Sequence, residues 1–124
     1  MADLTDRRIL VVEDEVILAM ELEAILLGAG CGSVAMAGTV PEALRAVGQE
    51  AFDAAVLDVN LQGEPSFPVA DALDAAGVPC VLLTGHSPQS LPERQRRRTV
   101  VGKPFDPEAL LATVAAQIGR RDRP

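Results

Sequence analysis

The stretch Asp53-Ala-Ala-Val-Leu-Asp58 decides the fold, because it has the length and composition of a strand that is buried on both faces. A parallel sheet covers both faces of its central strands, so these strands are nearly continuous apolar runs. The run ends on a carboxylate and meets a turn signal, Asn60-Leu-Gln-Gly63. Reactive groups of open α/β sheets lie just beyond the carboxyl ends of strands. We therefore predict that Asp58 is the reactive residue.

Length, charge and composition limit the kind of protein this chain can be. Its 124 residues are 48% hydrophobic, with a formal net charge of −7 and a pI near 4.6. This predicts a single domain over residues 1–124, with a core over about 7–119. The acidic balance disfavours nucleic-acid binding. No signal-peptide region or membrane span is recognisable, so we expect a soluble cytoplasmic protein without a membrane partner.

Four other apolar runs predict strands, at Arg8–Glu13, Ser33–Ala37, Cys80–Thr84 and Thr99–Gly102. Helical patterns begin after Asp14, at the capping box Thr39-Val-Pro-Glu42, near Val69 and at Asp106-Pro107. Strand and connection alternate five times, which predicts right-handed crossovers and a three-layer αβα sandwich around a parallel five-stranded sheet.

The sequence makes two further predictions about the connections between strands. The first helix is expected to bury one stripe of apolar residues at helical spacing: Val16, Ile17, Met20, Ala24 and Leu27. In the segment 87–98, Pro88 and Pro92 disfavour a long helix and predict a loop or a short turn.

Reactive side chains end four of the predicted strands: Glu13 with Asp14, then Asp58, Thr84 and Lys103. In a parallel sheet these ends lie on one edge, so the side chains are expected to converge. A pair of carboxylates ~4 Å apart repels by about 4 kcal/mol at an effective dielectric near 20. Protonation or a hard divalent cation relieves this repulsion, and oxygen ligands without His or Cys favour Mg²⁺.

A carboxylate beside Mg²⁺, a hydroxyl and an ammonium group forms a phosphoryl-transfer site. Asp58 is suited to act as the nucleophile and become an acyl phosphate. Lys103 and Mg²⁺ are suited to neutralise the phosphoryl oxygens, and Thr84 to donate a hydrogen bond to one of them.

The strand-end motifs resemble those of receiver domains of two-component response regulators, over essentially the whole chain. They are Val-Val-Glu13-Asp14-Glu, Val-Leu-Asp58-Val-Asn60, Leu-Leu-Thr84-Gly85 and Lys103-Pro-Phe105. The resemblance implies a flavodoxin-like fold with strand order 2-1-3-4-5. It also implies that Asp58 is phosphorylated, that Thr84 and Lys103 bind the phosphoryl group, and that Mg²⁺ is held by Glu13, Asp14, Asp58 and the backbone carbonyl of Asn60.

Within this family the chain resembles an alphaproteobacterial single-domain subgroup with a Pro-Phe-x-Phe-Ala-Thr-Gly signature, which Pro79–Gly85 keeps in part. Two positions depart from the common family pattern. Gln62 stands where many receivers have proline, and Val100 stands where most have an aromatic switch residue. A branched aliphatic side chain cannot swing as Tyr or Phe does, so coupling through Thr84 and an aromatic is not expected.

Two smaller signals have two interpretations each. The basic run Arg94, Arg96, Arg97 and Arg98 is either a solvated loop, which is favoured, or a surface for an acidic partner. His86 is either a residue at the rim of the site, which is favoured, or a residue that approaches the phosphoryl group, and we do not expect it among the metal ligands.

These observations predict a stand-alone receiver that accepts a phosphoryl group from a sensor histidine kinase or a histidine phosphotransferase. Its output would be protein–protein contact or phosphorelay, with no enzyme activity beyond self-phosphorylation and autodephosphorylation. One alternative is a phosphatase of the haloacid dehalogenase type, but that family needs a second Asp where Asn60 stands. Another is an interaction module that works without phosphorylation.

Overall fold

The structure is a computed structural model that describes residues 4–122, and its centre is a parallel sheet of five strands. The strands follow one another across the sheet in the order β2-β1-β3-β6-β7, which is 2-1-3-4-5 when only these five are counted. This confirms the predicted flavodoxin-like topology. Their bounds are β1 (Arg8–Val12), β2 (Ser33–Ala37), β3 (Ala54–Asp58), β6 (Cys80–Thr84) and β7 (Thr99–Gly102).

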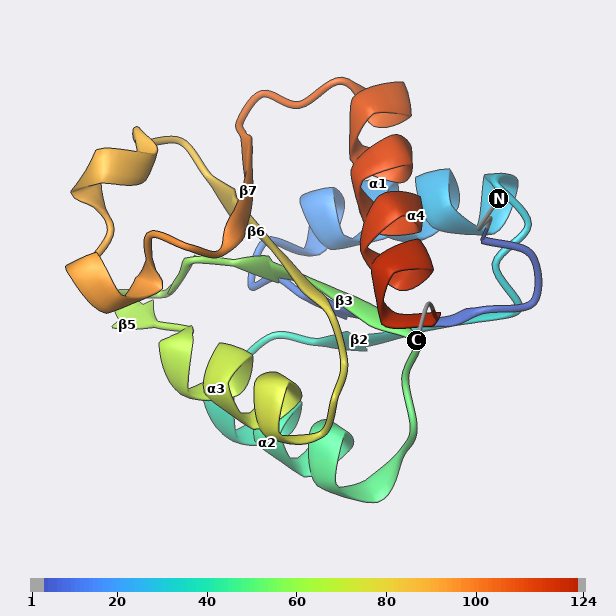
Figure 1. Ribbon diagram of the computed structural model, residues 1–124, viewed down its shortest axis with the longest axis horizontal. Helices are drawn as coiled ribbons and strands as arrows, with labels where there is room; N and C mark the ends of the chain where they lie inside the picture. Colours follow the sequence, from blue (N-terminus) through green and yellow to red (C-terminus); the bar gives the residue numbers. More distant parts are fainter. Residues whose placement is uncertain (1–3, 123–124) are drawn as a thin grey trace.

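Helices cover both faces of the sheet and complete the three layers (Figure 1). They are α1 (Val16–Gly28), α2 (Val40–Gln49), α3 (Phe67–Ala75) and α4 (Pro107–Asp122). Side chains alternate along each strand, so Leu57 packs with α2 and α3 in one core, whereas Val56 packs with α1 and α4 in the other. The predicted helix starts are confirmed at Thr39, whose Oγ1 accepts a hydrogen bond from Glu42 N (3.2 Å), and at Asp106, whose Oδ2 accepts one from Ala109 N (3.3 Å).

The buried face of α1 differs from the predicted one. The helix buries Ala19, Leu22 and Leu26 against the sheet, and the expected stripe points outward. Val16, Ile17 and Met20 are 70%, 83% and 57% exposed. The prediction was wrong because α1 has apolar residues at helical spacing on two sides, and spacing alone does not say which side meets the sheet. The result is an apolar surface on α1 that no other part of the described chain covers.

A small hairpin follows β3 where the sequence predicted a loop. It consists of β4 (Asn60–Leu61) and β5 (Glu64–Pro65), paired antiparallel. The connecting residues Gln62 and Gly63 have φ angles of 53° and 85°, which is the pattern of a type I′ turn. Proline is fixed near φ −65°, so it cannot take the place of Gln62 in this turn. The departure from the family pattern at this position therefore has a backbone reason.

The crossover from β6 to β7 contains no α-helix, as Pro88 and Pro92 predicted. Two short 3₁₀ turns, η1 (Pro88–Ser90) and η2 (Glu93–Gln95), take its place. Arg96 holds this segment together by donating to the carbonyls of Leu91 (3.0 Å) and Gln89 (3.2 Å).

The same crossover is attached to α3 by ion pairs. Arg98 lies 2.7 Å from Asp71 and 3.0 Å from Asp74. The favoured interpretation as a solvated loop is confirmed for Arg94, Arg96 and Arg97, which are exposed, whereas Arg98 is only 13% exposed and has a structural role.

Candidate functional site

The pairing of the strands brings the predicted residues to one edge of the sheet. Val12 is paired with Leu57, Asp58 with Leu83, and Thr84 with Gly102. Glu13, Thr84 and Lys103 therefore lie at or one residue beyond the carboxyl end of their strands, level with Asp58. Residues that are up to 90 positions apart in the chain meet there.

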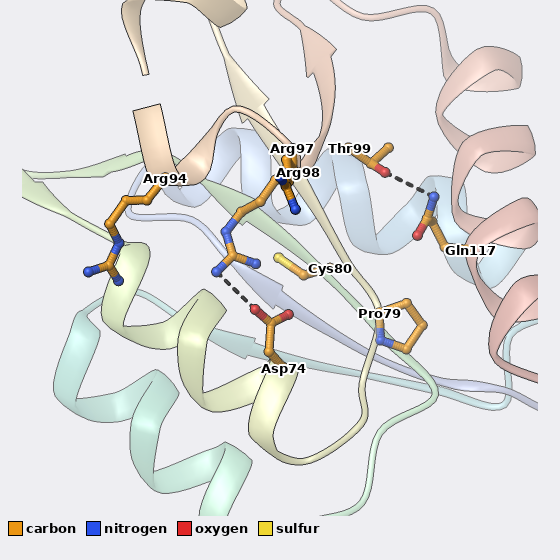
Figure 2. A pocket seen from close by; sticks show the side chains of 8 residues that line it. All are labelled: Asp74, Pro79, Cys80, Arg94, Arg97, Arg98, Thr99 and Gln117. Carbon is orange, nitrogen blue, oxygen red and sulfur yellow. Dashed lines mark hydrogen bonds and ion pairs between the residues drawn. The ribbon is translucent and has the colours of Figure 1, made fainter. Parts of the chain in front are cut away.

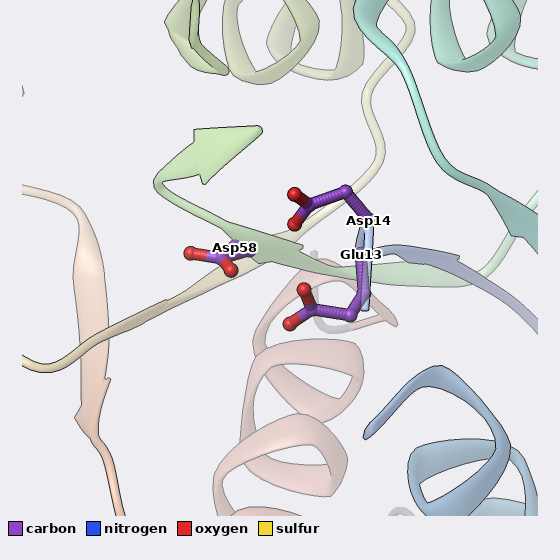
Figure 3. A group of neighbouring side chains, drawn as sticks. All are labelled: Glu13, Asp14 and Asp58. Carbon is purple, nitrogen blue, oxygen red and sulfur yellow. The ribbon is translucent and has the colours of Figure 1, made fainter. Parts of the chain in front are cut away.

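Three carboxylates form the acidic centre of this edge (Figure 3). Carboxylate oxygens of Glu13, Asp14 and Asp58 lie within 4.8 Å of one another. Glu13 and Asp14 follow β1, and Asp58 ends β3, so two adjacent strands build the cluster. At such separations like charges repel by several kcal/mol in a partly buried site, which makes the cluster a place for a cation.

Lys103 is the cation that the chain itself supplies. Its Nζ donates to Asp58 Oδ2 at 2.9 Å and lies 3.4 Å from Glu13 Oε1. The side chains of Glu13, Asp58 and Lys103 are only 1%, 12% and 25% exposed. Burial alone lowers the pKa of Lys103, but the hydrogen bond to Asp58 and the charges of Asp58 and Glu13 outweigh it and raise that pKa. The ammonium group thus stays charged inside the site.

Glu13 has an unusual protonation equilibrium for a glutamate. Burial raises its pKa to about 7, assisted by the negative charge of Asp58. This value is the balance that remains after the hydrogen bond that its Oε2 accepts from the backbone N of Glu15 (3.1 Å), and the charge of Lys103, have lowered the pKa. One ammonium group therefore does not fully balance the three carboxylates.

Thr84 and His86 continue the site along the next strand. Thr84 is buried, and its Oγ1 accepts a hydrogen bond from the backbone N of His86 at 3.1 Å. Its carbonyl accepts from the backbone N of Lys103 at 2.9 Å, which ties β6 to the residue that reaches Asp58. The His86 side chain is exposed and lies outside the carboxylate cluster, in agreement with the rim position expected for it.

Asn60 and Ser66, which follow β3 in the chain, hold Asp58 in position by hydrogen bonds. The backbone N of Asn60 donates to Asp58 Oδ1 at 3.1 Å. Ser66 is completely buried, and its Oγ donates to the backbone carbonyl of Asp58 at 2.6 Å. Sequence analysis did not single out Ser66, because it lies in a predicted loop eight residues from Asp58 and belongs to no recognisable pattern.

The donor set fits a magnesium ion. Ligand oxygens at about 2.1 Å from Mg²⁺ lie roughly 3–4 Å from one another in octahedral geometry, and the carboxylates of Glu13, Asp14 and Asp58 are within 4.8 Å. All of these donors are oxygens, the atoms that Mg²⁺ prefers. Their surplus negative charge also favours a divalent cation.

Fold and site together define a flavodoxin-like αβα domain with an acidic cluster and a lysine at the carboxyl edge of its sheet. The chain belongs to the family of response regulator receiver domains, whose family model matches residues 9–115. It is thus a signalling domain of two-component systems, as the sequence motifs predicted. Between residues 4 and 122, no helix has the length and apolar character needed to cross a membrane.

Curated relatives support the family at moderate identity. The DNA-binding response regulator MtrA of Mycobacterium tuberculosis is 36% identical over 124 residues, which cover 97% of this chain and 54% of MtrA. The phyllosphere-induced regulator PhyR of Methylorubrum extorquens is 31% identical over 111 residues, which cover 86% of this chain and 42% of PhyR. The chain thus spans about half the length of the curated relatives it matches.

A solved structure of nearly the same extent is that of SdrG from Sphingomonas melonis Fr1. It is 43% identical, has a TM-score of 0.74, and the match covers 95% of this chain and 98% of SdrG. The BeF₃-activated conformation of SdrG matches with 42% identity and a TM-score of 0.77, covering 95% of this chain and 99% of that structure.

Proposed function

We propose that this receiver domain accepts a phosphoryl group on Asp58 and that Thr84 and Lys103 bind that group. The observation that supports this most is the 2.9 Å contact between Lys103 Nζ and Asp58 Oδ2 beside two further carboxylates. The ammonium group is already placed where negative charge will accumulate.

The proposed reaction is a single displacement. A carboxylate oxygen of Asp58 attacks the phosphorus, and the bond from phosphorus to the donor breaks. The bonding electron pair leaves with a histidine nitrogen of the donor protein or with acetate, if acetyl phosphate is the donor. Lys103 then binds an oxygen of the acyl phosphate in place of the Asp58 carboxylate. Thr84 donates a hydrogen bond from its hydroxyl group to a second phosphoryl oxygen.

We assign the metal to Glu13, Asp14, Asp58 and the backbone carbonyl of Asn60. Mg²⁺, when bound, neutralises charge on the phosphoryl oxygens. Asp14 and Glu13 hold the ion next to Asp58, and the hydrogen bond from Asn60 N to Asp58 Oδ1 (3.1 Å) keeps the carboxylate oriented.

We propose a sensor histidine kinase or a histidine phosphotransferase as the phosphodonor, and the cytoplasm as the location of the protein. A donor that brings a phosphohistidine to Asp58 must cover the rim of the site, and α1 begins three residues after Glu13. The exposed side chains of Val16, Ile17 and Met20 offer apolar contact area at this place. We expect the donor protein to bury this surface during transfer.

A matched pair of variants tests this contact. Ile17→Lys places a charge in the apolar surface near the site, whereas Leu27→Lys does so ten residues further along α1, ~15 Å away at the usual rise per residue. Ile17→Lys is expected to slow transfer from the donor protein at least tenfold and to leave labelling by acetyl phosphate unchanged. Equal effects of the two variants would contradict the proposed docking.

Phosphorylation adds roughly −1.5 to −2 charges at the carboxyl edge of the sheet. Movement of Thr84 and Lys103 toward these charges is transmitted to the segment 85–98 and to β7 with α4. Val100 is half-buried on β7 and packs against the core, so it does not act as a rotating switch. Output by protein–protein contact or phosphorelay follows from this rearrangement.

The central test is incorporation of phosphate from acetyl phosphate in the presence of Mg²⁺. The wild type is expected to gain one acid-stable, alkali-labile phosphoryl group, and Asp58→Asn none. Labelling of Asp58→Asn at the wild-type rate would refute the site.

Two assays on the wild-type protein distinguish the two alternative functions from the proposed one. Steady turnover of a phosphate monoester would indicate a phosphatase, although the amide at Asn60 cannot serve as a general acid. An absence of spectral change on addition of beryllofluoride and Mg²⁺, together with unchanged partner binding, would indicate an interaction module independent of phosphorylation.

A further inference from the structure

A groove runs along the side of the molecule opposite to the phosphoacceptor edge, at the start of β6 and β7. It consists of two adjoining cavities of about 390 and 330 Å³, which share Asp74, Pro79 and Gln117. The first cavity forms where the helix-free crossover 85–98 meets the sheet (Figure 2). The second continues toward the last turn of α4.

Guanidinium groups line both ends of this basic groove, in a chain whose net charge is −7. Arg94, Arg97 and Arg98 line the first cavity, and Arg120 and Arg121 line the second. The carboxylate that lines both is Asp74. The residues that line the groove therefore carry a surplus of positive charge, which ion pairs of Arg94 with Asp71, of Arg98 with Asp71 and Asp74, and of Arg121 with Asp53 and Asp122 offset in part. The groove lies at the end of the molecule away from the acidic cluster.

The arginines of the groove differ in how firmly they are held. Arg98 is only 13% exposed and is fixed by Asp71 and Asp74. Arg121 is held by Asp53 and Asp122. Within residues 4–122, however, the side chains of Arg97 and Arg120 form no hydrogen bond or ion pair, and both residues are exposed. Two guanidinium groups, one from each end of the groove, are thus available to a ligand.

We propose that this groove binds an acidic segment of a partner protein, with carboxylates of that segment paired to Arg97 and Arg120. Guanidinium forms two parallel hydrogen bonds to a carboxylate, so arginine suits this recognition. The backbone of an extended segment fits along the shared floor, where the amide of Gln117 offers a further polar contact; Gln117 now donates to Thr99 Oγ1 at 2.9 Å.

Charge distribution favours an acidic peptide over a nucleic acid. A phosphodiester chain carries a negative charge at every nucleotide and needs a continuous positive surface. Asp74 lines the middle of the groove, and Asp71 and Asp74 already neutralise Arg98. A peptide can place carboxylates at the two ends and neutral residues opposite Asp74, whereas a phosphodiester chain cannot.

The proposal is tested by titrating the ¹⁵N-labelled chain with a capped peptide of six glutamates at low salt, and with six glutamines as the neutral probe. We expect amide shifts around Arg97, Thr99 and Arg120 with the acidic peptide alone, and weaker binding as salt is added. Arg97→Ala and Arg120→Ala are each expected to weaken binding about two- to fivefold, the range of exposed ion pairs.

Arg45→Ala is the matched control, because Arg45 is exposed on α2 and has no ion-pair partner within residues 4–122. It should leave the affinity unchanged. Equal binding of the glutamine peptide, an equal loss with Arg45→Ala, or shifts confined to other surfaces would overturn the proposal. Tighter binding of a single-stranded oligonucleotide than of the acidic peptide would overturn it as well, by assigning the groove to nucleic acid.

Discussion

Replacing Ser66 with alanine tests whether its hydrogen bond to the backbone of Asp58 stabilises the domain. The Ser66 side chain is completely buried, and its Oγ donates to the backbone carbonyl of Asp58 at 2.6 Å. Ser66→Ala removes this donor, which is buried, and leaves the carbonyl of the half-buried Asp58 with one hydrogen bond fewer. The same serine lies between the β4–β5 hairpin and α3, so the variant also loosens the segment that follows Asp58.

The size of the effect follows from the burial. Loss of a buried hydrogen bond that leaves its acceptor unsatisfied costs about 1–2 kcal/mol. For a domain of this size that corresponds to a fall in Tm of roughly 3–10 °C. Ser90 provides a matched control, because its Oγ donates to the carbonyl of Ser87 at the same 2.6 Å but is exposed. Water replaces the lost partner there, so Ser90→Ala is expected to cost below about 0.5 kcal/mol.

Urea denaturation of the wild type and of both variants measures the difference. We expect Ser66→Ala to lower the midpoint with an unchanged slope, because the surface exposed on unfolding stays the same. Equal free-energy losses for Ser66→Ala and Ser90→Ala would refute the argument from burial. Unchanged stability of Ser66→Ala would show that the contact with the Asp58 carbonyl contributes nothing net.

Three other predictions concern stability, pH and metal. Gln62→Asn should raise the free energy of unfolding by a few tenths of a kcal/mol, because Asn adopts positive φ more readily, whereas Gln62→Pro should lower it by about 2–3 kcal/mol; chemical denaturation of both compares them. Burial raises the pKa of Asp53, but the backbone N–H of Arg8 and the side chain of Arg121 outweigh it, so the folded pKa lies below the ordinary 3.8. Its contribution is therefore present above about pH 4 and is lost as the pH falls through the folded pKa. Asp53→Asn should cost about 1 kcal/mol at pH 7, after allowance for solvent screening, and progressively less as the pH falls below about 4, which urea titrations at pH 7 and in acid would measure. Millimolar Mg²⁺ should raise the Tm of the wild type by a few degrees and that of Asp14→Asn by less than half as much, and an equal rise in both would argue against Asp14 as a ligand.

The acidic site was predictable because it depends on topology. Once Asp53–Asp58 is recognised as a buried parallel strand, the residues that end the other strands must lie on the same edge, whatever their distance in sequence. The positions of Glu13, Thr84 and Lys103 near Asp58 could be predicted without any knowledge of side-chain packing. Their separations did need it, since the 2.9 Å contact from Lys103 to Asp58 depends on rotamers and on the twist of the sheet.

Packing of α1 was not predictable in the same way. Its sequence has apolar residues on two sides, and a helix rotated by half a turn would satisfy the same spacing rule. The sheet contacts Leu22 and Leu26 and not Ile17. The paths of the chain from β1 into α1 and from α1 into β2 decide this rotation of the helix. The exposed apolar surface beside the site therefore becomes visible only in the folded protein.

The sequence by itself determined the parallel sheet and the meeting of acids, hydroxyl and lysine at one edge, because strand periodicity and connection length are local properties. The strand order came from the resemblance of the strand-end motifs to those of receiver domains. Tertiary structure alone decided which side of α1 faces water, that Ser66 supports Asp58 from within, and that arginines from the crossover and from α4 line one groove. These features depend on which surfaces of distant elements touch, and such contacts produce no repeating pattern of residue types in the sequence.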